Sequence, residues 1–142
     1  MELLLALNNL AHYIGIAFGL GGATIAFIIS RKADKDQKSA KVLMPLMRSI
    51  STLIFIGLLL LVVSGIGLMF TVKWPLNKPL LVVKHILVAL IFINGIYLGR
   101  ASRKIEKLKG TSKFDEVRKR MKNIGAFNLF LWYFVTVISV VI

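Results

Sequence analysis

The chain alternates long apolar stretches with shorter basic ones. Four stretches carry little or no charge: Leu3–Ser30, Ile50–Val72, Pro79–Gly99 and Ile124–Ile142. Each is about 20 residues or longer, the length at which an α-helix rising 1.5 Å per residue crosses the hydrocarbon core of a bilayer. We therefore predict an all-α integral membrane protein, a four-helix bundle in which residues 1–142 form a single domain.

The composition supports a membrane protein and excludes several other classes. Hydrophobic residues make up 57% of the chain, against about 45–50% in soluble domains, and four spans leave no room for a dinucleotide-binding unit or a catalytic sheet. The absence of cysteine excludes disulfides, thiolate metal sites and cysteine nucleophiles. The first stretch lacks the basic start and the small-residue cleavage site of a signal peptide, so we expect it to remain as a helix.

The net charge of +13 is concentrated in two connections. Six Lys/Arg lie in residues 31–49 and ten in residues 100–123, whereas the turn between the second and third spans holds only Lys73 and Lys78. Basic loops stay in the cytoplasm, so we predict a multi-pass protein of the cell membrane with both termini outside. This distribution disfavours nucleic acid as a partner, because nucleic-acid binding needs a basic face on a folded soluble domain.

The second basic connection carries a helix-start pattern. Ser112 followed by Asp115 fits a capping box, and Phe114, Val117 and Met121 then recur at helical spacing. We predict that the fourth helix extends into the cytoplasm with a solvated basic face. The same face suits anionic lipid headgroups, at about 1 kcal/mol per basic residue close to the surface.

Three basic side chains stand inside the predicted spans, where a charge at the bilayer centre costs about 2.5–3.5 kcal/mol. His12 lies in the first span, and Lys84 and His85 lie in the third. If Asn8-Asn9 mark the outer interface of the first span and Pro79 that of the third, all three lie roughly 5–9 Å deep, in one layer. Two histidines at one depth suit a b-type haem or a transition metal. His12, Lys84 and His85 are therefore candidate cofactor-binding residues, and His12 and His85 candidate metal ligands.

Simpler explanations of these residues stay open. An intramembrane histidine is often a packing residue that bonds to a carbonyl or a hydroxyl of a neighbouring helix, and a lysine stem can reach the interface. Lys84 and His85 also lie about 100° apart around one helix, so we expect only one of them to point inward. The stripe of Lys84 contains Val88, Ile91, Gly95 and Gly99, and that of His85 contains Ala89, Phe92 and Ile96.

Glycines recur in the first three spans and allow two interpretations. They permit close helix packing through small residues, or they clear space between helices for a flat macrocycle. The glycines concerned are Gly15, Gly19, Gly21, Gly22, Gly57, Gly65, Gly67, Gly95 and Gly99.

The chain resembles a known family over all four predicted helices, most clearly in the third and the first. The stretch from Lys84 to Gly99-Arg100 is similar to the third helix of the HemJ-type membrane protoporphyrinogen IX oxidases, where a lysine precedes an apolar helix that ends in Gly-Arg. Leu10-Ala11-His12 followed by Gly22 resembles that family's first helix. The resemblance extends to CopD-like copper-resistance membrane domains. It implies a bundle that binds haem b, with His12 and Lys84 as the candidate catalytic residues.

Three functions are compatible with these observations. The first is a haem b redox protein, either an oxidase that converts protoporphyrinogen IX to protoporphyrin IX or an electron relay, with haem or porphyrin and a membrane electron acceptor as partners. The second is a copper-handling or copper-transport protein, in which Met69 would supply a soft thioether ligand. The third is an accessory membrane subunit without a cofactor. Whether the chain is an oxidoreductase, and whether it forms a homo-oligomer, stays open between them.

Overall fold

The computed structural model describes residues 2–35, 37–71, 78–108 and 111–141. Those residues form helices joined by short connections, and the first span is continuous through a π-helical turn. The elements are α1 Glu2–Ile16, η1 Ala17–Gly21, α2 Gly22–Lys35, α3 Gln37–Thr71, α4 Lys78–Lys107 and α5 Lys113–Val141. The π-helical turn falls where glycine lowers helix propensity, in the sequence Gly19-Leu-Gly-Gly22.

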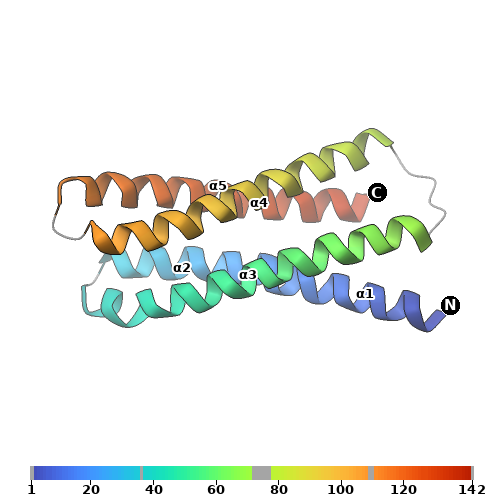
Figure 1. Ribbon diagram of the computed structural model, residues 1–142, viewed down its shortest axis with the longest axis horizontal. Helices are drawn as coiled ribbons and strands as arrows, with labels where there is room; N and C mark the ends of the chain where they lie inside the picture. The colour runs from blue at the N-terminus through green and yellow to red at the C-terminus, as the bar shows by residue number, and fades with distance from the viewer. Residues whose placement is uncertain (1, 36, 72–77, 109–110, 142) are drawn as a thin grey trace.

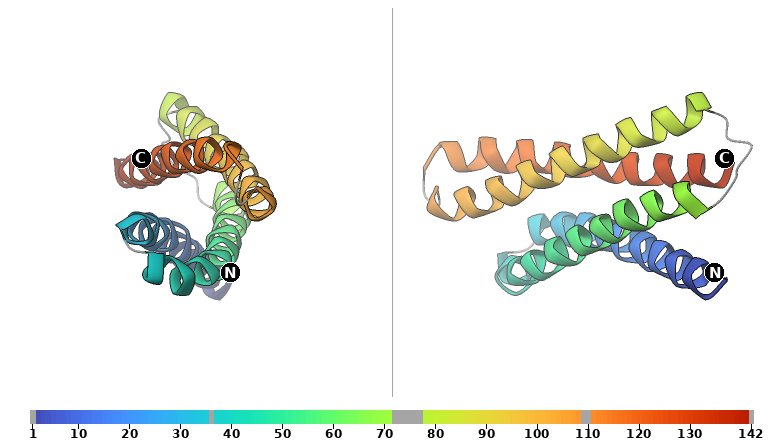
Figure 2. Two further views of the ribbon diagram at one scale, coloured as in Figure 1. Left: turned by 90° about the vertical axis from the view of Figure 1, so that its left-hand side faces the viewer. Right: turned by 45° about the vertical axis from the view of Figure 1, so that its right-hand side comes forward.

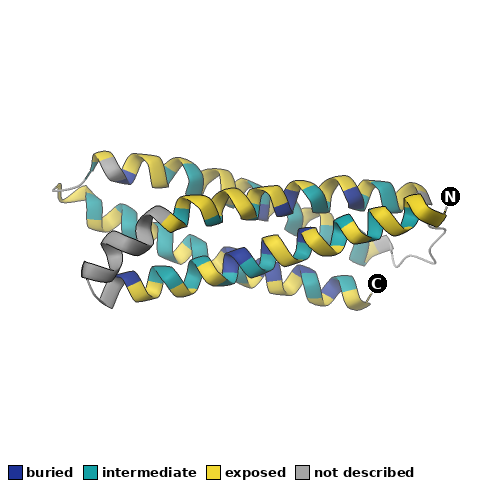
Figure 3. Cartoon of the chain, turned by 90° about the horizontal axis from the view of Figure 1, so that it is seen from below, coloured by how far each residue is buried: buried dark blue, intermediate teal, exposed yellow. Residues whose placement is uncertain are grey.

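The structure confirms four helices that are long and apolar enough to cross a membrane. Their spans are Glu2–Ala33, Leu46–Phe70, Pro79–Ile105 and Lys113–Val141. Large apolar side chains remain exposed along all of them (Figure 3), including Leu3 at 73% and Phe70 at 88% exposure. An apolar surface of this extent is unfavourable in water and matches the acyl chains of a bilayer.

The helices run up and down, so that both termini lie at one end of the bundle (Figure 1). The last turn of α3 and the first turn of α4 lie at that same end, and the facing ends of α2 and α3 and of α4 and α5 lie at the other end. The distribution of basic residues predicts this pairing of connections. Lys73 and Gly110 lie outside the described residues.

The helices extend further into the two basic connections than the sequence predicts. The predicted spans end at Ser30 and Gly99, and the second begins at Ile50. The backbone of both connections is mostly helical, because α2 runs to Lys35, α3 begins at Gln37 and α4 continues to Lys107. A charged segment that leaves the apolar layer keeps its helical hydrogen bonds, so the end of a span need not be the end of a helix. The predicted extension of the fourth helix is confirmed, since α5 begins at Lys113, directly after Ser112.

The helices pack as two groups. The first span packs along α3, and α4 packs along α5, whereas α4 contacts α3 only slightly. The two groups meet in a small core centred on Trp132, which is 2% exposed. Figure 2 shows the two groups side by side, with the N-terminal part of α1 diverging from α5. The buried core residues are Ala23, Leu58, Ile91, Leu131, Trp132 and Val135.

Candidate functional site

The ring of His12 is held by a hydrogen bond from α1 to α3. His12 Nδ1 lies 2.9 Å from Ser64 Oγ, and the Ser64 hydroxyl is 2.5 Å from the carbonyl oxygen of Leu60. A carbonyl only accepts, so the Ser64 proton is donated to Leu60 and Ser64 Oγ must accept from His12 Nδ1–H. This arrangement places a proton on Nδ1, so in the neutral form of the ring the lone pair lies on Nε2.

Asn8 strengthens the same contact one turn away. Its side-chain nitrogen Nδ2 donates to the backbone oxygen of Ser64 at 3.0 Å. Ser64 is 1% exposed, while Asn8 and His12 are half-buried. We call Asn8, His12 and Ser64 the histidine cluster. It joins α1 to α3 near the end of the bundle that carries the termini.

Glycines bring the two helices of the histidine cluster into direct contact. A Cβ atom on Gly57 would lie 2.6 Å from the backbone nitrogen of Gly19 and 2.9 Å from the backbone oxygen of Gly15. A Cβ atom on Gly67 would lie 2.7 Å from Asn8 Oδ1. These glycines serve close packing, the first of the two interpretations from the sequence.

Lys84 and His85 have different environments, as their spacing on one helix predicts. Lys84 is half-buried on α4 and close enough to His12 to interact with it electrostatically. His85 is exposed, and its Nδ1 donates to the carbonyl oxygen of Leu81 on its own helix at 2.7 Å. Lys84 therefore lies on a more buried side of α4 than His85 does.

The two stripes of α4 follow these two residues. Ile91 is 1% exposed and Val88 is half-buried, on the stripe of Lys84. On the stripe of His85, Ala89 and Ile96 are exposed but Phe92 is half-buried against the core, and Gly95 on the stripe of Lys84 is exposed. The side of α4 that turns towards the bundle therefore runs from Lys84 through Val88 and Ile91 and includes Phe92.

Among the described residues, no group of three or more His, Cys, Asp or Glu side chains is arranged to hold a metal ion. Met69, the candidate thioether ligand, is 46% exposed. His85 is exposed as well, and its described hydrogen bond is to its own helix.

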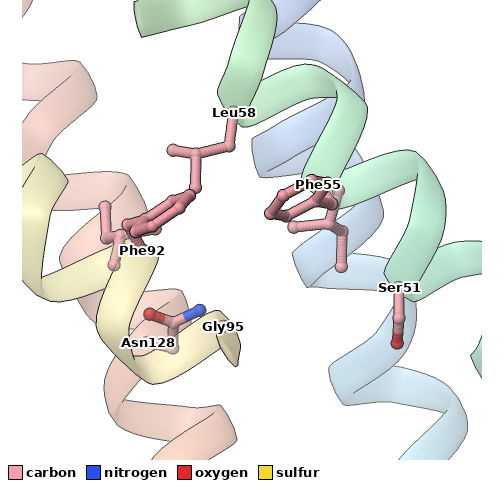
Figure 4. A pocket seen from close by; sticks show the side chains of 8 residues that line it. Ser51, Phe55, Leu58, Phe92, Gly95 and Asn128 are labelled. Atoms are coloured by element: carbon pink, nitrogen blue, oxygen red, sulfur yellow. The ribbon is translucent and has the colours of Figure 1, made fainter. Parts of the chain in front are cut away.

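A second polar feature lies further along the bundle. Leu58, which lines it, is six residues from Ser64 on α3, an axial rise of about 9 Å. This feature is a pocket of about 50 Å³ between α3, α4 and α5. Asn128 reaches it from α5, beside Gly95 and Phe92 of α4 (Figure 4). The lining residues are Ser51, Ile54, Phe55, Leu58, Ile91, Phe92, Gly95 and Asn128.

Asn128 is only 7% exposed, and its Oδ1 is buried without a hydrogen-bond partner among the described residues. Trp132 Nε1, one turn further on α5, is also buried without a described partner. The sequence pattern does not single out Asn128, because it is one of several small polar residues in the spans. The one sequence feature that distinguishes Asn128 is its position in the first apolar turns of the span, just after the basic extension of α5.

Comparisons of the chain with protein-family models, with curated proteins and with solved structures give no match. The fold by itself defines a class: an all-α membrane protein with four helices long and apolar enough to span the bilayer. The resemblance to the HemJ-type and CopD-like families remains a prediction from the residues.

Proposed function

We propose that this chain is a haem b-binding membrane protein that transfers electrons, with His12 as a ligand of the haem iron. The observation that carries this proposal is the hydrogen bond from His12 Nδ1 to Ser64 Oγ. It leaves Nε2 with a lone pair on a ring whose orientation is held. Histidines that bind metals typically have their other ring nitrogen held in this way.

The donors of this layer fit a haem better than they fit copper. The candidate donors are an imidazole nitrogen on α1 and a primary amine on α4, within electrostatic range of each other. Copper(I) prefers thioether and thiolate sulfur, and the chain contains no cysteine. When bound, haem supplies one-electron chemistry at its iron.

Each residue of the layer has a defined task in this proposal. His12 binds the iron through Nε2, and Ser64 holds the tautomer that leaves Nε2 free. Asn8 keeps α1 against α3, so that the ring stays in place. Lys84 places a positive charge beside the site, where it favours the carboxylates of a porphyrin and can hold a proton at Nζ.

Visible absorption of the full chain tests the haem. We expect a Soret band in protein purified from membranes after haem supply, and loss of that band in His12→Ala. His85→Ala is the matched control, because His85 is exposed and bonds only to its own helix. A colourless wild type, or equal loss of the band in both variants, would contradict the proposal.

Two further readouts separate the other functions. Metal analysis after dialysis distinguishes haem iron from copper. A colourless wild type whose stability falls in His12→Ala would assign the histidine cluster to helix packing, as in an accessory subunit without a cofactor. If the haem is present, oxidation of protoporphyrinogen IX by membranes with and without Lys84→Met tests the oxidase against the electron relay.

The proposed site lies on the outer side of the cell membrane, with both termini outside and the basic ends of α4 and α5 against anionic headgroups of the inner leaflet. Exposed basic side chains at that end support this orientation; they are Arg100, Arg103, Lys104, Lys107, Lys113, Lys119 and Arg120. Because the chain has no cysteine, Glu2→Cys and Lys119→Cys can each be labelled alone. An impermeant thiol reagent added to intact cells should label the first variant only.

A further inference from the structure

The pocket between α3, α4 and α5 has a buried floor and an exposed mouth. Leu58, Ile91 and Asn128 form the floor, and Ser51, Phe55 and Gly95 lie at the mouth. The mouth opens between α3 and α4, where these helices contact each other only slightly. Since it opens on spanning segments, the pocket is accessible from the bilayer.

The floor holds an unused hydrogen-bond acceptor. Asn128 Oδ1 has no partner among the described residues, and a buried polar atom without a partner is unfavourable by about 1–3 kcal/mol. Figure 4 shows the amide of Asn128 at the pocket, beside Gly95. Apart from Ser51 at the mouth, the other walls are apolar, with the rings of Phe55 and Phe92 6.0 Å apart between their centroids.

The size of the pocket limits what the amide can bind. About 50 Å³ exceeds the roughly 10–15 Å³ that one water requires, and is far below the roughly 300–1,000 Å³ of a pocket for a drug-sized ligand. The occupant at the amide is therefore a water-sized group. An O–H group both donates and accepts, so it can donate to Asn128 Oδ1 or accept from Asn128 Nδ2.

We propose that this pocket is a binding site for an O–H group, held by the Asn128 amide and admitted from the bilayer through the gap beside Gly95. The O–H group belongs to a trapped water or to the hydroxyl end of a lipid-soluble molecule whose apolar part stays outside the pocket. The site is separate from the histidine cluster and does not depend on the proposed haem.

Solid-state NMR on the full chain in deuterated lipid bilayers tests the site directly. The chain is labelled with ¹³C at asparagine, and Asn128→Leu identifies the amide carbon of Asn128 by its loss. Magnetisation transfer to that carbon is measured first from water protons and then, in D₂O, from the methylene next to the hydroxyl of 1-octanol. Transfer from water alone assigns a trapped water, and transfer from 1-octanol assigns the hydroxyl of a lipid-soluble molecule.

Two glycines of α4 provide matched variants. A Cβ atom on Gly95 or on Gly99 meets nothing within 4 Å, but only Gly95 lines the pocket. We expect Gly95→Leu to fill the mouth and reduce the transfer by about threefold or more, and Gly99→Leu to leave it unchanged. An unaltered Asn8 signal serves as the check that each variant folds, and Gly95→Val with Gly99→Val replaces the pair if leucine prevents folding. Absence of transfer from both probes in the wild type, or equal loss in both variants, would overturn the proposal.

Discussion

The histidine cluster and the Asn128 pocket are both polar layers inside one bundle, yet they are satisfied to different degrees. At the histidine cluster, Ser64 donates to Leu60 and accepts from His12, and Asn8 donates to the Ser64 backbone. At the pocket, Asn128 Oδ1 has no described partner. The difference lies in the distance between the helices, because a side-chain hydrogen bond across an interface requires the two backbones to be close.

Glycine has opposite consequences in these two regions. Gly15 and Gly57 bring α1 against α3 until their backbones touch, and polar side chains can then reach the facing helix. Gly95 and Gly99 face open space instead, because α4 packs along α5 and contacts α3 only slightly. A small residue therefore permits close packing, but the arrangement of the other helices decides whether another helix packs against it.

The largest expected effect comes from removing the close contact between α1 and α3. Gly57→Ala places a Cβ atom 2.6 Å from the backbone nitrogen of Gly19, so a backbone must move. We expect the free energy of unfolding to fall by about 3 kcal/mol, measured by SDS titration in mixed micelles with circular dichroism. Gly99→Ala is the control, and we expect it to be neutral or to stabilise by up to about 1 kcal/mol through helix propensity. Equal effects of the two variants would contradict the comparison.

A smaller effect is expected from Ser64→Ala. It leaves His12 Nδ1–H without its acceptor in a buried interface, which costs about 1–2 kcal/mol in the free energy of unfolding. Ser139→Ala is the matched control, because the described bond of Ser139 is to Val135 on its own helix. The same SDS titration measures both, and a loss in Ser139→Ala as large as that in Ser64→Ala would show that the bond between helices adds nothing.

The smallest effect is expected from Asn128→Leu. Leucine has a similar size, and no protein group is left without its partner, so we expect the free energy of unfolding to change by less than about 1 kcal/mol. The titration is repeated in micelles with and without 1-octanol. A loss greater than that of Ser64→Ala in both conditions would mean that Asn128 bonds to the protein, and the contrast between the two layers would fail.

Much of the fold can be predicted from the sequence because hydropathy is a local property. The four apolar stretches predict the four spanning helices, and the pattern that begins at Ser112 predicts the start of α5. The C-terminal ends of α2 and α4 and the start of α3 lie beyond the predicted spans. Loss of hydropathy marks where a helix leaves the apolar layer and not where its hydrogen bonds end.

The site could be predicted only in part. The sequence identifies His12, Lys84 and His85 as unusual in a membrane span, and helical spacing separates Lys84 from His85 on α4. Which of the two points inward depends on the rotation of α4 about its axis, and this rotation is set by its packing on α5. The partner of His12, Ser64, lies 52 residues away, so no local pattern connects them.

The sequence by itself determines that this chain is helical, apolar enough to span a membrane four times and basic at the connections at one end of the bundle. These properties depend on each residue and its near neighbours in the chain. Only the tertiary structure decides that Gly57 is in contact while Gly95 is open, that His12 Nδ1 meets Ser64 Oγ and that Asn128 Oδ1 lacks a described partner. Each of these depends on the distance between two helices, which is a property of their packing and not of either helix alone.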